Sequence, residues 1–333
     1  MSTPSAASGT PGHHGRGALI ATARAPEVGS LHALLDSIDA DVARAWVVLQ
    51  DVPGTDADAV AAHPAVARVL TADLLPLSHA RNLALHEVFR DATDPDRIPT
   101  FVGFPDADGS YAPGSLDAVT AALATGVDVI VGRYGPSDGP IDIERFPDTP
   151  GDLDWGGVRS RATSVTLFVS GRAAIGLGYV MPYLGLGTPW PAGEDVEYAL
   201  RALKRGYTGR YVPEAVTHHP YGTELDPARR PIRYLLVAAY PPPGGTTIVR
   251  SLKRLAAGPS QPTNPAENAA DTAAAAASLG VKTEVASAFK GVQPSAVRRL
   301  RSFAAATPAQ QWVLVQRDGR TGTPTSGKGA DTP

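Results

Sequence analysis

Cysteine is absent from the 333-residue chain. Disulfides, thiolate metal sites and cysteine nucleophiles are therefore excluded, and any metal must be held by Asp, Glu, His or water. The chain also lacks an apolar run approaching the roughly 18 residues that a membrane-spanning helix needs. Residues 1–16 are polar, rich in Gly, Ser and Pro, and contain no apolar stretch of the signal-peptide kind. We expect a cytoplasmic protein whose residues 1–16 are disordered.

The chain also lacks a large excess of either sign of charge, because it has 30 Lys and Arg and 33 Asp and Glu, for a formal net charge of -3. Such a balance gives no broad basic field, so nucleic acid is not an expected partner. What is present is an ordinary globular composition, 43% hydrophobic and 19% charged. A chain of this length and composition can bury a sizeable core.

Between residues 17 and about 220, short apolar runs alternate with amphipathic stretches, which is typical of a sheet covered by helices. Helices are expected over 78–90, with Ser78 as N-cap, over 112–126 and over 193–206, the last two ending at glycine. The six predicted strands, which together indicate one doubly wound α/β domain, are 18–23, 45–50, 67–71, 100–104, 127–132 and 164–170.

From about Pro241 the composition changes to Pro- and Ala-rich, low-complexity sequence. We therefore divide the chain into a domain over 17–240 and a partly disordered linker and tail over 241–333. One patch in the tail, 294–316, mixes three arginines with Leu, Phe and Trp. It predicts a basic amphipathic helix that touches an anionic membrane or a partner, or else a weakly ordered tail helix.

Two aspartates, Asp106 and Asp108, follow directly after the predicted strand 100–104. Ligands of open α/β sheets bind at the carboxyl ends of strands, and two carboxylates one residue apart can converge on Mg²⁺ or Mn²⁺. A cation held in this way would bridge to a diphosphate. The alternative is a solvated turn, since Asp, Gly and Ser all form turns.

Two further stretches carry charged residues at predicted helix starts. Arg81 lies in the first turn of the helix 78–90, where the guanidinium and the helix end could bind a diphosphate, although it could also be a surface arginine. Glu194 and Asp195 open the helix 193–206 after a Gly- and Pro-rich loop. Capping is the alternative explanation for this acidic pair.

In chain order, LSHARNLAL (77–85), FPDADGSY (104–111), the W-P-A-GED segment (190–195) and YVPEAVTHHP (211–220) resemble the family 2 glycosyltransferases of the GT-A fold. The resemblance covers residues 17–222. It implies a mixed, doubly wound sheet flanked by helices. It also implies a metal-dependent, inverting enzyme that transfers a sugar from a nucleotide-sugar donor to a hydroxyl of a glycan, polysaccharide or lipid-linked acceptor.

Carried over by position, the resemblance makes Asp108 the metal ligand and places Asp106 on the ribose or on the waters of the metal. Asp195 becomes the base that deprotonates the acceptor, with Glu194 as the fallback, and Trp190 stacks on a sugar ring. A carboxylate base suffices for inverting transfer without a covalent nucleophile. We expect the helix end to lower the pKa of Asp195 and so to weaken it as a base.

Three features of the resemblance are less specific. Family members often bring a histidine to the metal, and here His218 is preferred over His219, while a surface or hydrogen-bonded histidine is the alternative for either ring. The stretches that usually bind the donor base read IATARAPE and VVLQDVPG, which leaves Asp51 and Thr22 as the candidate contacts. A peripheral position at the inner face of the plasma membrane would follow if the basic tail segment contacts lipid.

Other readings of the same residues remain open. A haloacid dehalogenase-like phosphatase would use Asp106 as nucleophile and Asp108 as acid and base, together with a lone lysine. A nucleotidyltransferase would open with a Gly-rich loop and a basic residue, of which ATARAPEVGS is a poor version. A non-catalytic carbohydrate-binding protein would explain the degenerate nucleotide strands.

Overall fold

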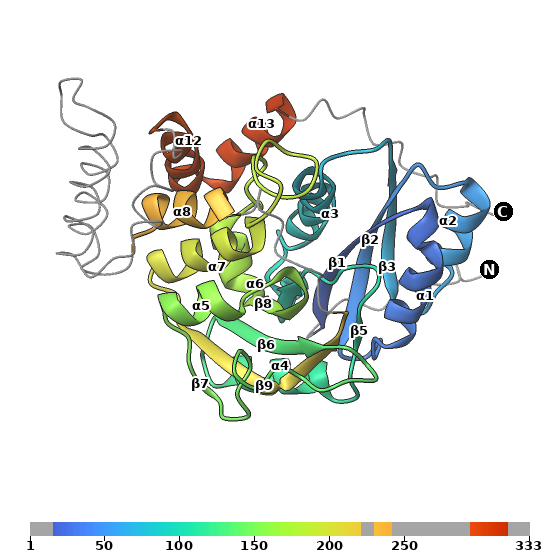
Figure 1. Cartoon of the computed structure of the whole chain (residues 1–333). Helices are drawn as coiled ribbons and strands as arrows, with labels where there is room; N and C mark the ends of the chain where they lie inside the picture. Colours follow the sequence, from blue (N-terminus) through green and yellow to red (C-terminus); the bar gives the residue numbers. More distant parts are fainter. Residues whose placement is uncertain (1–15, 221–229, 242–293, 319–333) are drawn as a thin grey trace, which may run out of the picture.

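The computed structural model describes residues 16–220, 230–241 and 294–318 (Figure 1). Its strands are β1 Gly17–Arg24, β2 Ala43–Gln50, β3 Val66–Ala72, β4 Phe101–Gly103, β5 Ser110–Tyr111, β6 Val129–Gly135, β7 Gly151–Asp152, β8 Leu167–Ser170 and β9 Gly209–His218. Its helices are α1 Val28–Asp36, α2 Gly54–Ala61, α3 Leu77–Asp91, α4 Ser115–Ala124, α5 Trp155–Arg161, α6 Gly171–Leu177, α7 Glu194–Lys204, α8 Arg230–Ala239, α12 Pro294–Ala305 and α13 Pro308–Asp318.

The nine strands form one mixed sheet in the order β3-β2-β1-β4-β8-β6-β9-β5, with β7 paired to β9. Strands β1 to β4 run parallel, so their carboxyl ends meet at one edge. Strand β8 is antiparallel to both of its neighbours, whereas β6 and β9 pair in parallel. The predicted α/β architecture, a mixed sheet flanked by helices, is confirmed.

The sheet separates two hydrophobic cores, as expected from the alternation of side chains along a buried strand. Along β1, Ala18 and Ile20 face one core and Leu19 and Ala21 face the other. Helices α1, α2 and α4 supply the second core, while α3, α6, α7, α8, α12 and α13 supply the first. Figure 1 shows the blue helices α1 and α2 on the side of the sheet away from α3 and α7.

All six predicted strands are present, with ends shifted by a few residues. Strand β9 was not predicted, because Pro213 and Glu214 interrupt its apolar run, and β5 and β7 are too short to give a periodic signal. The prediction that Ser78 caps a helix is wrong. Helix α3 begins at Leu77 after Pro76, and the buried Ser78 hydroxyl donates to the carbonyl of Leu184.

The C-terminal patch forms two helices, α12 and α13, rather than one. Leu300 and Phe303 of α12 are buried in the first core. The Arg301 guanidinium donates to the carbonyls of Ala238 and Ala239 at the end of α8, at 2.7 and 3.3 Å. The apolar side of the predicted amphipathic helix therefore packs against the protein. Within the described residues, no helix combines the length and hydrophobicity needed to cross a bilayer.

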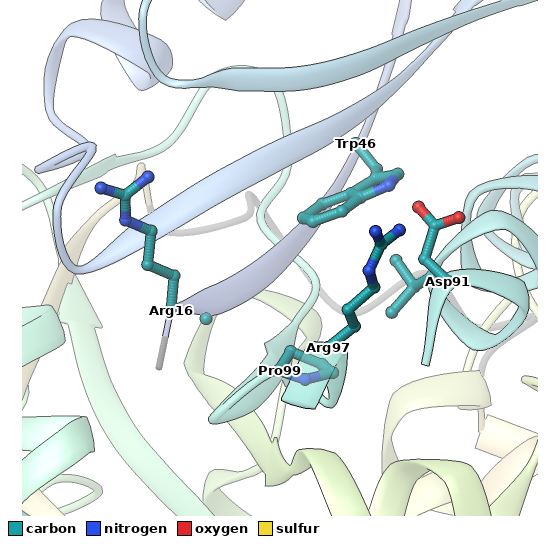
Figure 2. A pocket seen from close by; sticks show the side chains of 7 residues that line it. Arg16, Trp46, Asp91, Arg97 and Pro99 are labelled. Atoms are coloured by element: carbon teal, nitrogen blue, oxygen red, sulfur yellow. The ribbon is translucent and has the colours of Figure 1, made fainter. Parts of the chain in front are cut away.

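The expected disordered start, 1–16, falls outside the described residues except for its last residue, and the expected linker lies outside them from 242 to 293. A small pocket lies at the amino-terminal ends of β1 and β4, where Trp46 and Arg97 line it (Figure 2). This is the edge of the sheet opposite to the carboxyl ends of β1 to β4.

Candidate active site

The predicted site residues gather at the carboxyl edge of the parallel strands. Asp106 and Asp108 follow β4 on a turn that closes when the Gly109 N–H donates to the Asp106 carbonyl at 3.0 Å. The next two residues form β5, which pairs with the end of β9 so that Ser110 lies opposite His218. Because of this register, the chain after β9 lies beside the aspartate turn.

The structure places His219, and not the preferred His218, beside the aspartates. Its Nε2 lies 3.2 Å from Asp108 Oδ1 and 3.9 Å from Asp106 Oδ2. Its Nδ1 lies 2.7 Å from the carbonyl oxygen of Pro220, and since a carbonyl only accepts, Nδ1 is the protonated nitrogen. His218 is instead the last residue of β9 and pairs with Ser110 and Gly135.

Arg81 joins the two acidic pairs. Its Nη2 donates to Asp106 Oδ1 at 2.8 Å, and its Nη1 donates to Glu194 Oε1 at 2.9 Å. Only 2% of the Arg81 side chain is exposed, and only 8% of the Glu194 side chain. The guanidinium therefore lies between the loop after β4 and the start of α7. Its contact with a diphosphate stays a prediction.

The acidic pair Glu194 and Asp195 opens α7 after Gly193, whose φ of 86° is in the left-handed region. Burial, reinforced by the neighbouring Asp195, raises the pKa of Glu194 to about 7 despite the opposing effect of Arg81. Burial also raises the pKa of Asp195, although Oδ1 of this side chain accepts the N–H of Val196 at 2.7 Å. The expected lowering of the Asp195 pKa by the helix end is therefore wrong, because desolvation outweighs it.

The loop before α7 is tied to the start of α3. The Leu77 N–H donates to the carbonyl of Leu186 at 2.9 Å, and the Gly185 N–H donates to the carbonyl of Trp190 at 2.9 Å. A Cβ on Gly185 would lie 2.7 Å from Ser78 Oγ, so this position needs glycine for space as well as for its φ of 98°. Trp190 is partly buried against the first core, and its contact with a sugar stays a prediction.

The candidate contacts for the donor base lie on the neighbouring strands. Thr22 is a partly buried residue of β1, paired with Val48 of β2. Asp51 directly follows β2 and is exposed. With φ of 51°, Asp51 is the one non-glycine residue of positive φ in the described part of the chain. Aspartate tolerates this backbone conformation better than most residues do. Both contacts remain predictions.

Ser164 is a site residue that the sequence did not reveal. Its hydroxyl lies 3.1 Å from Asp106 Oδ2 and 3.3 Å from Asp106 Oδ1, and its backbone N–H contacts the Asp195 carboxylate. Fifty-eight residues separate Ser164 from Asp106. A lone serine before a strand gives no periodic or motif signal that could have identified it.

The donor set around Asp106, Asp108 and His219 fits a hard divalent cation in its chemistry. A neutral imidazole protonated at Nδ1 directs the lone pair of Nε2 at two carboxylates, and this arrangement requires a proton or a cation. In the described residues, no three His, Asp or Glu side chains already stand in the geometry of a metal site. The two carboxylates and the imidazole would have to converge on an ion.

The arrangement of the strands and helices defines the fold of this protein. Its mixed sheet flanked by helices is the GT-A fold of the glycosyltransferases, which confirms the fold that the resemblance implied. The chain matches no family model and none of the curated proteins. Its similarity to known proteins is therefore a similarity of structure.

Among solved structures, the chain resembles TarS of S. aureus with a TM-score of 0.53 and 15% identity, over 91% of this chain and 55% of that one. The chain thus spans about half of the length of that protein. TarS 1-349 in complex with UDP matches with a TM-score of 0.50 and 15% identity, over 91% and 90% of the two chains. TarS 1-349 in complex with UDP-GlcNAc matches with a TM-score of 0.50 and 14% identity, over 91% of each.

Proposed function

We propose that this protein is a metal-dependent, inverting glycosyltransferase of the family 2 type. It takes the sugar from a nucleotide-sugar donor and transfers it to a hydroxyl of a glycan, polysaccharide or lipid-linked acceptor. One observation carries the proposal: Arg81 bonds to Asp106 and to Glu194, and thereby holds the two acidic pairs together at the carboxyl edge of the sheet. A donor and an acceptor could meet there.

The acidic pair of α7 divides into two roles. Glu194 is bonded by Arg81 and buried, so it keeps the guanidinium in place. Asp195 uses one carboxylate oxygen to accept the N–H of Val196 and is the base that takes the proton from the acceptor hydroxyl. Burial raises the pKa of Asp195, and a base whose pKa is closer to neutral removes a proton more effectively.

Asp108, Asp106 and His219 would hold the metal ion, Mg²⁺ or Mn²⁺. Once bound, such an ion offsets the negative charge of the departing nucleoside diphosphate. The chain's own residues orient its ligands, since Asp106 accepts from Arg81 and His219 donates to the carbonyl of Pro220. Positioning of the donor against the acceptor supplies the remaining effect.

The donor nucleotide is proposed to be a uridine diphosphate sugar, because the structural neighbour TarS 1-349 has been solved with UDP and with UDP-GlcNAc. Asp51 and Thr22, at the ends of β2 and β1, are the proposed contacts of the base and ribose. Trp190 is the proposed platform for the acceptor sugar. A peripheral contact with the membrane would use the exposed Arg298 and Arg299 of α12, since the apolar side of α12 packs inward.

The phosphatase reading is weaker on this geometry. Its nucleophile, Asp106, accepts bonds from Arg81 and Ser164. Among the described residues the one lysine, Lys204, stands at the end of α7, where its Nζ lies 5.3 Å from the centre of the Tyr240 ring. The nucleotidyltransferase reading also loses support, because the basic residue near the first strand, Arg24, pairs with Glu27.

A thermal-shift screen tests the proposal, with UDP, GDP, dTDP and CDP each offered with and without Mn²⁺ or Mg²⁺. A ligand at 100 times its dissociation constant adds about 2.7 kcal/mol. That is about 5 to 10 °C for a domain of this size. We expect a metal-dependent shift with UDP that Asp108→Ala abolishes and that the matched control Asp58→Ala, an exposed aspartate of α2, retains.

No shift with any of the four nucleotides would refute the proposed function. A shift without turnover would favour the non-catalytic carbohydrate-binding reading. Asp195→Asn distinguishes a transferase from a non-catalytic binding protein. In a transferase this variant should abolish sugar transfer and leave the nucleotide-induced shift in place. A non-catalytic protein would show no transfer in either form.

A further inference from the structure

Ser164 lies beside the loop that bears Asp106 and beside the start of α7, and it comes from a segment of the chain other than α3, which supplies Arg81. It begins the 3-10 turn Ser164–Thr166, which leads directly into β8. The turn is fixed from within, because the Thr163 N–H donates to the Thr166 hydroxyl at 3.1 Å and Thr166 is fully buried. Ser164 is therefore presented by a rigid support.

Its two polar groups bond to different acidic pairs. The hydroxyl donates to Asp106, and the shorter distance, 3.1 Å, is to Oδ2. The backbone N–H of the same residue contacts the Asp195 carboxylate and favours its ionised form. One residue thus contacts both the proposed metal-side carboxylate and the proposed base.

The two carboxylate oxygens of Asp106 have different partners, so the Ser164 hydroxyl can fix the one that Arg81 does not bond. Arg81 bonds to Oδ1 at 2.8 Å. Oδ2 is the oxygen that faces His219, with Nε2 at 3.9 Å, and it is also the oxygen to which the Ser164 hydroxyl is nearer. Without the hydroxyl, the carboxylate would be held at Oδ1 only and could rotate about that bond.

We infer that Ser164 is a positioning residue, whose hydroxyl sets the orientation of Asp106 Oδ2 toward His219. The inference rests on the proposed function, because it assigns Ser164 a task in orienting a proposed metal ligand. Hydrogen-bond partners of metal ligands typically contribute 10- to 100-fold to metal affinity or activity.

Three variants test the inference. Ser164→Ala removes the hydroxyl bond to Asp106 and leaves the backbone of the turn unchanged. Ser164→Thr keeps a hydroxyl at the same position and should rescue the loss. Ser160→Ala is the matched control, because the Ser160 hydroxyl donates within α5 to the carbonyl of Gly156 at 3.0 Å and the residue is exposed.

The measurement is isothermal titration of Mn²⁺ into each protein saturated with the nucleoside diphosphate that gave the largest shift in the screen. We expect Ser164→Ala to weaken Mn²⁺ binding about 10-fold or more. Ser164→Thr should stay within about threefold of the wild type, and Ser160→Ala should not differ from it. Nucleotide affinity in EDTA and the melting temperature should be the same in all four proteins.

Each other outcome has a defined meaning. If Ser164→Ala binds Mn²⁺ as the wild type does, the inference is overturned and the proposed function stands. If the melting temperature and the nucleotide affinity in EDTA fall together with the Mn²⁺ affinity, Ser164 is a general structural residue and the inference is likewise overturned. If the wild type binds none of the four nucleotides, both the inference and the proposed function fail.

Discussion

Replacing Arg81 with methionine is the sharpest test of how the site is held together. The change removes a guanidinium that is 2% exposed and leaves Glu194, 8% exposed, without its cation. Breaking a buried pair on one side costs about 3 to 5 kcal/mol. The Asp106 side chain is 35% exposed, so its share adds only about 0.2 to 1 kcal/mol. We expect a loss of about 3 to 5 kcal/mol, measured near pH 8.

The loss should depend on pH with a defined sign. Glu194 has a pKa of about 7 in the folded wild type, and Arg81 lowers that pKa, so it climbs further in the variant. When the pH is below this raised pKa, Glu194 is protonated and neutral, so the variant does not bury an unpaired charge. Arg81→Met should therefore be less destabilising at pH 6 than at pH 8.

Urea unfolding followed by tryptophan fluorescence at both pH values measures the effect. The matched control is Arg90→Met on the same helix, where the side chain is 54% exposed and pairs with Glu87, so about 1 kcal/mol or less is expected. The double variant Arg81→Met with Glu194→Gln should recover at least half of the loss. A loss equal to that of Arg90→Met, or one that grows toward low pH, would refute this account of the site.

Two further changes follow from the same reasoning. The stability of Glu194→Gln relative to the wild type should rise progressively between pH 4.5 and 7, by up to about 3 kcal/mol in urea unfolding, whatever constant cost follows from leaving Arg81 without this carboxylate. The folded-state pKa is raised above its ordinary value, so the wild type loses stability as pH rises, and a difference that is flat with pH would contradict the buried carboxylate. Trp312→Ala removes a ring stacked on His86 at 3.9 Å between centres, and should cost about 2 kcal/mol. The control is Val313→Ala, at a residue that is 61% exposed, which should cost about 0.5 kcal/mol or less. Equal unfolding midpoints for the two variants would mean that the packing of α13 on α3 does not stabilise the protein.

The sequence predicted what depends on local pattern. Apolar runs and helical periodicity predicted the six strands and the helices α3, α4 and α7, because each of these segments carries its apolar pattern within its own length. Motif order gave Asp106, Asp108, Glu194 and Asp195 as candidates. Asp106 and Asp108 lie at the carboxyl edge because they follow β4, and Arg81 of α3 links Asp106 to Glu194 of α7.

What the sequence could not predict depends on register and on long-range contact. His218 and His219 are adjacent residues of the same type, so the sequence does not distinguish them. Only the pairing of Ser110 with His218 decides which ring lies beside the aspartates. The direction of the Asp195 pKa depends on burial, which a helix-end argument leaves out. The Ser164 contact is set by the turn before β8, far along the chain from Asp106.

The docking of α13 has a consequence for how the protein is made. The Gln311 amide is fully buried, accepts the N–H of Tyr179 at 2.8 Å, and thereby joins residues that are 132 positions apart. On the ribosome, at about 5 to 20 residues per second, that separation corresponds to roughly 7 to 26 seconds of synthesis. During this interval α13 has not been synthesised, so the side of α6 that it later covers stays uncovered. Slower translation across this stretch would lengthen the time in which chaperones must shield it.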